Sequence, residues 1–169
     1  MTPPLISAII IAALHLTHPD FQAAATAYDG YMKRPVEEAL GQAASSKPDI
    51  REVKQWLGES YHFRYIMRDP VTPTPPAVTE ATRAGDCKDK ALWLAAKMED
   101  PADVVFVIGR ARANSRINHA WLAWASGGSV WILDPTNCPS PLRADRIRKG
   151  EYIPEFFFTR YGTFAASPD

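Results

Sequence analysis

The sequence predicts an α+β fold, with helices in the first part of the chain and an antiparallel sheet in the second. Apolar residues recur at helical spacing up to residue 98, whereas β-branched and aromatic runs dominate from residue 104 onward. Gly127 and Gly128 separate two of these runs and are typical of a tight β-hairpin. Helices followed by strands, without regular alternation, favour an α+β architecture.

Length and charge limit the classes of function. The chain has 169 residues, enough for one domain with a hydrophobic core. Its 19 basic residues equal its 19 acidic residues, so we expect no nucleic-acid partner. The two cysteines, Cys87 and Cys138, are too few for a disulfide framework and lack the spacing of a zinc site.

The N-terminal residues 1–27 are predicted to be distinct from the rest. The apolar run Leu5–Leu16 is too short to span a membrane, but it has the length of a signal-peptide core. No Lys or Arg precedes Lys33, so the usual basic start of a signal peptide is missing. We expect either a signal peptide of a periplasmic or secreted protein, or an N-terminal helix of a cytoplasmic one. Residues 28–169 are predicted to form a single domain.

Three helices are predicted before residue 100. The first covers residues 26–40, and the second covers residues 50–65 with Asp49 as its cap. Four prolines between positions 70 and 76 predict an extended loop without regular structure. The third helix covers residues 87–98 and places Cys87 at its start.

The remaining chain reads as strands. Residues 104–109, VVFVIG, predict a buried strand, and two more strands flank the glycine pair. Residues 143–151 are charged and predicted to be exposed. The aromatic segment at residues 152–164 predicts one final strand.

The hairpin predicts that two chemically suited side chains lie close together. With the glycines at the turn, Trp121 faces Asp134 and Ala123 faces Ile132 across the two strands. His119 is then the diagonal neighbour of Asp134, with Cβ atoms roughly 7 Å apart. A carboxylate at that distance can accept a hydrogen bond from an imidazole ring, whereas a shift of one residue would separate them.

A histidine oriented by an aspartate is two thirds of a nucleophilic triad. Cys87 can supply the nucleophile, because the positive end of a helix dipole and a nearby imidazolium both favour a thiolate. Taken singly, each residue has an ordinary explanation: a buried cysteine, a hydrogen-bonded histidine and a turn aspartate before proline. The order of helix-start Cys87, strand His119 and strand-end Asp134 favours a catalytic site.

The two aspartates beside Cys87 would disfavour a thiolate if they pointed at it. We therefore expect Asp86 to cap the helix and Asp89 to turn to solvent or to another polar partner. A metal site at Asp86, Asp89 and Cys87 is an alternative, although a thiolate is a poor ligand for calcium.

Three segments resemble the transglutaminase-like superfamily of papain-like fold, and in layout the bacterial transglutaminase-like cysteine proteinases. They are GDCKDKALWLAAKM, NHAWLAWASGGSVWILDPT and the preceding FRYIMRDP, and the resemblance covers about residues 50 to 137. It implies a Cys-bearing helix packed on an antiparallel sheet, with Cys87 as nucleophile, His119 as general base and Asp134 as its orienting residue.

The resemblance also implies an oxyanion hole and, in some members, calcium. The backbone N–H of Cys87 is one expected donor, and the second is sought among four upstream side chains: Trp56, Tyr61, His62 and Tyr65. Some proteinases of this group bind calcium through acidic residues near the cysteine and commonly carry an acidic residue directly after it. Lys88 stands at that place here, which argues against a calcium site.

We therefore predict a thiol-dependent amide hydrolase or acyl transferase that acts on a peptide or protein substrate. It is expected to be a monomer without cofactor, metal or membrane span. The alternatives are a protein-glutamine transglutaminase, which uses an amine instead of water, and a non-catalytic peptide-binding module of the same fold. Trp121 is expected to pack in the hairpin or to line the cleft.

Overall fold

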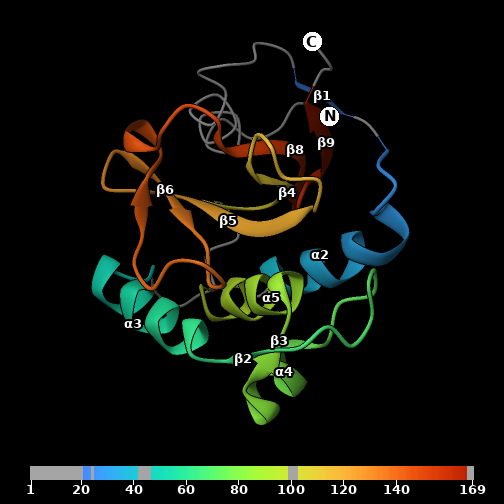
Figure 1. Cartoon of the computed structure of the whole chain (residues 1–169), viewed down its shortest axis with the longest axis vertical. Coiled ribbons are helices and arrows are strands. Elements are labelled where there is room, and N and C mark those ends of the chain that lie inside the picture. The colour runs from blue at the N-terminus through green and yellow to red at the C-terminus, as the bar shows by residue number, and fades with distance from the viewer. Residues whose placement is uncertain (1–20, 24, 42–46, 99–102, 167–169) are drawn as a thin grey trace.

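A seven-stranded antiparallel sheet and a group of helices on one of its sides make up the fold (Figure 1). The computed structural model describes residues 21–23, 25–41, 47–98 and 103–166. The strand order in the sheet is β1-β9-β8-β4-β5-β6-β7. The strands are β1 (Phe21–Ala23), β4 (Val104–Arg112), β5 (His119–Ser126), β6 (Ser129–Leu133), β7 (Leu142–Arg143), β8 (Glu151–Thr159) and β9 (Gly162–Ala166).

The helices precede most of the sheet in sequence. They are a π-helical turn η1 (Asp29–Lys33), α2 (Arg34–Leu40), α3 (Ile50–Tyr61), α4 (Pro76–Thr82) and α5 (Cys87–Met98), with a 3₁₀ turn η2 (Ala144–Arg146) between strands. A short parallel pair, β2 (Arg64–Tyr65) and β3 (Ala84–Gly85), leads the chain into α5. The predicted α+β fold, with the Cys-bearing helix on an antiparallel sheet, is confirmed.

Helix α5 forms the centre of the molecule. This helix is buried on nearly all sides. Its apolar side chains pack against residues on one face of the sheet, among them Phe106 of β4 and Leu122 of β5. A second apolar cluster covers the opposite face and contains Trp121 and Ile132. Successive residues of β5 alternate between these two clusters, as a strand with both faces covered requires.

The predicted cap of the second helix is present. Asp49 accepts hydrogen bonds from the backbone N–H of Arg51 at 2.7 Å and of Glu52 at 3.0 Å. The Glu52 carboxylate in turn accepts from the backbone N–H of Asp49, which completes a capping box. The helix ends at Tyr61, four residues earlier than predicted, because the chain turns there toward the β2 strand.

The proline-rich segment is more regular than predicted. Residues 76–82 form α4, although we expected an extended loop without regular structure. Pro76 is the first residue of this helix, where its fixed φ fits and its missing N–H costs nothing. The prolines therefore start a helix instead of preventing one.

The hairpin register is as predicted, whereas the last segment is not. Leu122 pairs with Leu133 and Ser126 with Ser129, with positive φ values of 59° and 72° at Gly127 and Gly128. Residues 152–164 contain two strands, parts of β8 and β9, instead of the one we expected. The turn at Arg160 and Tyr161 reverses the chain between them.

Most of the N-terminal segment lies outside the described residues. Of residues 1–27, positions 1–20 and 24 are not described, so the expected signal peptide or helix there stays a prediction. The described part includes β1, which pairs with β9 at the edge of the sheet. No helix in the described part of the chain is long and apolar enough to cross a membrane.

Strands β4 and β8 approach each other closely at a bulge. Their register shifts between Ile108 and Gly109. A Cβ atom on Gly109 would press against the carbonyl oxygen of Ile153 and lie 2.9 Å from the Cα atom of Pro154. The two residues of β8 that approach Gly109 directly follow Tyr152 in the chain.

Gly109→Ala is expected to lower the free energy of unfolding by roughly 1–3 kcal/mol, because backbone atoms must move to admit the methyl group. Gly30→Ala is the control, since a Cβ there meets nothing within 4 Å. Urea unfolding of both variants measures the difference. Equal stability of Gly109→Ala and the wild type would contradict the close packing of β4 and β8.

Candidate active site

Cys87 is the first residue of α5, and its position is fixed by the cap of that helix. The Asp86 carboxylate accepts hydrogen bonds from the backbone N–H groups of Lys88 at 3.1 Å and Asp89 at 3.2 Å. This is the N-cap that the sequence predicted. The free Cys87 side chain is half-buried and lies at the positive end of the helix dipole.

His119 is the first residue of β5 and lies beside Asp134, which directly follows β6. The Nε2 atom of His119 lies 2.8 Å from Oδ2 of Asp134. Both side chains are largely buried, and Asp134 has no exposed surface. The diagonal neighbours of the predicted hairpin therefore meet in a direct hydrogen bond.

The His119 ring interacts with Cys87 as well as with Asp134. Burial disfavours the imidazolium, but hydrogen bonds to Asp134 and to Cys87 outweigh it and raise the pKa of His119 to about 9. Because Nε2 is engaged by Asp134, Nδ1 is the ring nitrogen left for the thiol. The structure thus brings the three residues singled out in the sequence into one cluster at one end of the sheet.

Asp134 is held by donors on both carboxylate oxygens. Its Oδ1 atom accepts from the backbone N–H groups of Thr136 at 3.0 Å and Asn137 at 3.1 Å. Its Oδ2 atom lies near His119, the Asn137 amide at 3.0 Å and the Tyr152 hydroxyl at 2.9 Å. Burial acts to raise the pKa of Asp134, but these hydrogen bonds hold it below its ordinary value.

Two of these partners were not predicted from the sequence. The Asn137 amide nitrogen lies 3.1 Å from Nε2 of His119, and its position three residues after Asp134 in a turn was a usable signal. Tyr152 belongs to β8, a different hairpin, and no local pattern connects it with Asp134.

Aromatic rings support His119 from one side. Trp121 is fully buried and stacks near-parallel to the His119 ring, with ring centroids 5.9 Å apart. Tyr152 meets Trp121 edge-on at 5.4 Å. Of the two roles expected for Trp121, packing in the hairpin is right. The side chain does not line a cleft, because it is fully buried against His119.

Among the four oxyanion-hole candidates, Tyr65 contacts Cys87. Burial raises the pKa of the Tyr65 hydroxyl, with further contributions from the charges of Cys87 and Asp86. The Tyr65 hydroxyl is thus close enough to Cys87 to interact with both its backbone and its side chain. It therefore lies near the N–H that the sequence predicted as an oxyanion donor.

Buried charges beside Cys87 are satisfied within the protein. The Lys88 ammonium pairs with the Asp86 carboxylate and donates to the carbonyl of Asp69 at 2.6 Å. The Asp89 carboxylate accepts from the backbone N–H of Thr74 at 2.7 Å and from its hydroxyl at 3.1 Å. Of the two alternatives expected for Asp89, the polar partner is right. The expectation that Asp89 turns to solvent is wrong, because the side chain is buried.

The residues of the metal alternative make other contacts in this structure. Across residues 21–166, apart from the undescribed positions, no group of three His, Cys, Asp or Glu side chains is placed to hold a metal ion. The Asp86 carboxylate is already paired with a cation, the ammonium group of Lys88.

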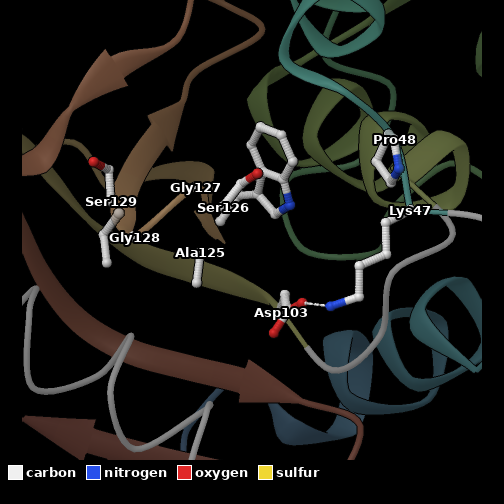
Figure 2. Close-up of a pocket in the computed structure, with 10 residues that line it drawn as sticks. Lys47, Pro48, Asp103, Ala125, Ser126, Gly127, Gly128 and Ser129 are labelled. Atoms are coloured by element: carbon white, nitrogen blue, oxygen red, sulfur yellow. Dashed lines mark hydrogen bonds and ion pairs between the residues drawn. The ribbon is translucent and has the colours of Figure 1, made fainter.

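Two pockets lie at opposite ends of the hairpin. One, of about 360 Å³, is at the Gly127–Gly128 turn, where Lys47 pairs with Asp103 (Figure 2). The other, of about 530 Å³, is lined by Asn137, Cys138 and Tyr152 among others, and adjoins the Asp134 cluster. The second borders the candidate site through Asn137 and Tyr152, but Cys87, His119 and Asp134 do not line it.

Comparison with known proteins gives similarity in structure alone. No protein-family model matches the sequence, and no curated protein matches it. LapG of Legionella pneumophila, solved in an EGTA-treated form, has a TM-score of 0.54 and 16% identity, over 96% of this chain and 86% of LapG. The calcium-bound form of LapG gives 0.54 and 15%, over 98% and 88%.

This similarity confirms the predicted fold. The transglutaminase-like resemblance stated from the three sequence segments agrees with a structural match over nearly the whole chain. At such low identity it is a statement about the fold, and the chemistry must be argued from the site itself.

Lys88→Ala is expected to lower the free energy of unfolding by about 3–5 kcal/mol, because it leaves the buried Asp86 carboxylate without its cation. Lys97→Ala is the matched control on the same helix. Its partner Glu80 is half-exposed, so the loss should stay below about 1 kcal/mol. Thermal and urea unfolding measure both, and equal losses would contradict the role assigned to Lys88.

Proposed function

We propose that this protein is a thiol-dependent acyl-transfer enzyme that hydrolyses amide bonds of a peptide or protein, with Cys87, His119 and Asp134 as its catalytic residues. The observation that carries the proposal is the His119 ring, which is hydrogen-bonded to Asp134 and interacts electrostatically with Cys87. If the three residues had separate structural roles, thiol, imidazole and carboxylate would not need to interact with one another.

The first half of the reaction forms a thioester. The Cys87 sulfur, as a thiolate beside the His119 imidazolium, attacks the amide carbonyl carbon. The carbon–nitrogen bond breaks, and the His119 proton passes to the leaving amine. Asp134 holds the ring in the tautomer that presents Nδ1 to the reacting atoms.

The second half releases the acid. Neutral His119 takes a proton from water, whose oxygen attacks the thioester carbonyl, and the sulfur leaves as a thiolate beside the regenerated imidazolium. The backbone N–H of Cys87 stabilises the oxyanion in both halves. Tyr65 is the side chain best placed for a second donor, since its hydroxyl already meets Cys87.

An amine in place of water would make the same site a transglutaminase. Incubation with a glutamine peptide and a labelled primary amine separates the two reactions. Release of ammonia without incorporation of the label supports hydrolysis, whereas incorporation into the peptide supports transglutamination.

Cys87 is expected to react with iodoacetamide at pH 5–6 at least tenfold faster than Cys138, because the His119 imidazolium favours its thiolate. Cys138 is the internal control, since burial raises the pKa of its thiol. Peptide mass spectrometry measures the two sites separately. Equal reactivity, together with unchanged peptide binding by Cys87→Ala, would favour the non-catalytic binding module.

His119 is expected to titrate near pH 9, and lower in Asp134→Asn, because the carboxylate stabilises its imidazolium. Protonated His119 predominates below that pH and is lost as pH rises through it, so the imidazolium needed as proton donor disappears on the alkaline side. Ring signals in ¹⁵N-edited NMR, assigned with His119→Gln, measure the titration. A midpoint at the ordinary value of about 6.5 in the wild type would contradict the proposed site.

A further inference from the structure

We infer that Tyr152 is a positioning residue for the proposed reaction: its hydroxyl fixes the Asp134 carboxylate and keeps it ionised while that carboxylate orients His119. The inference rests on the proposed function. Tyr152 lies outside the Cys-His-Asp set, and its role is argued from its contacts alone.

The contact between Tyr152 and Asp134 is direct. The Tyr152 hydroxyl donates to Oδ2 of Asp134 at 2.9 Å, the same oxygen that binds Nε2 of His119. The two backbone donors on Oδ1 fix one side of the carboxylate, so Tyr152 limits rotation at the other. A carboxylate with both oxygens held presents a constant direction to the imidazole ring.

The backbone of Tyr152 is unusual in a way that serves this contact. Its φ is 49°, in the left-handed region that a non-glycine residue seldom adopts. Gly109 lets β8 approach β4 immediately after this residue, and the turn at Gly150 precedes it. Such backbone strain persists where surrounding structure imposes it, and here it accompanies a side chain aimed at the site.

The ring of Tyr152 is also fixed. It is half-buried in the second apolar cluster and packs edge-on against Trp121, which stacks on His119. The hydroxyl of Tyr152 therefore contacts the Asp134 carboxylate. Its ring contacts Trp121, which in turn packs against His119.

The titratable groups that interact with Asp134 in the described part of the chain bear on the expected pH dependence. They are His119 from β5, Tyr152 from β8, Cys138 from the turn that follows Asp134, and Lys90 from α5. Lys90 donates to the carbonyl of Phe63 and acts on Asp134 only through its charge. Tyr152, like His119 and Asn137, makes a hydrogen bond that favours the ionised carboxylate.

The direction of the effect follows. As pH falls, Asp134 is protonated and its charge no longer holds the His119 imidazolium in place, so a less firmly oriented imidazolium stabilises the Cys87 thiolate. Without the Tyr152 hydroxyl, protonation of Asp134 begins at higher pH, because one donor to the carboxylate is gone. The acid limb of Cys87 reactivity therefore moves to higher pH.

The test is the pH dependence of Cys87 alkylation by iodoacetamide, resolved by peptide mass spectrometry, in the wild type, Tyr152→Phe and Tyr161→Phe. Tyr152→Phe keeps the ring that packs on Trp121, and Tyr161→Phe removes an exposed hydroxyl in the β8–β9 turn. We expect Tyr152→Phe to move the acid limb up by about one pH unit, or about tenfold in rate on that limb. Tyr161→Phe should match the wild type.

The outcomes separate the inference from the function on which it rests. A reactive Cys87 with the same acid limb in Tyr152→Phe and the wild type overturns the role of Tyr152 and leaves the proposed function standing. A wild-type Cys87 no more reactive than Cys138 overturns both. Circular dichroism and melting show whether Tyr152→Phe folds. If it does not, 3-fluorotyrosine at position 152, a stronger donor, must shift the limb to lower pH.

Discussion

The hydrogen bond between His119 and Asp134 is the interaction on which the rest of the candidate site depends. It joins the first residue of one strand to the residue that follows the next, so it exists only in one register of the hairpin. A shift by one residue would turn the two side chains to opposite faces of the sheet. The two glycines at the turn, with their positive φ values, hold that register.

The same end of the sheet receives the start of α5. Asp86 caps this helix, Lys88 neutralises the cap, and Asp89 ties the helix to the proline-rich segment through Thr74. The acidic residues beside Cys87 are therefore engaged by structural partners other than the thiol. This explains how a cysteine between two aspartates can still meet an imidazolium, since the opposing charges are already paired or hydrogen-bonded.

Much of this site was predictable because its determinants are local. The helix cap at Asp86, the hairpin register and the meeting of His119 with Asp134 follow from patterns within about twenty residues of chain. The four prolines predict an extended loop instead of the helix at residues 76–82, although proline suits the first turn of a helix.

Tyr152 was missed for a different reason. Its contact with Asp134 depends on how β8 crosses β4 at a bulge, and neither the bulge nor the left-handed backbone leaves a local signal. Lys88 is an intermediate case. The sequence alone shows that Lys88 departs from the pattern of the proteinases that this chain resembles. Its contacts with the Asp86 carboxylate and the Asp69 carbonyl can be seen only in the folded structure.

The central claim is that the His119 ring lies between the Cys87 sulfur and the Asp134 carboxylate, and a crystal structure tests it most directly. The account predicts about 3.5–4 Å between Sγ of Cys87 and Nδ1 of His119, with Asp134 on the far side of the ring. A ring that turns away from Cys87 while keeping Asp134, or a separation beyond about 6 Å, would contradict it.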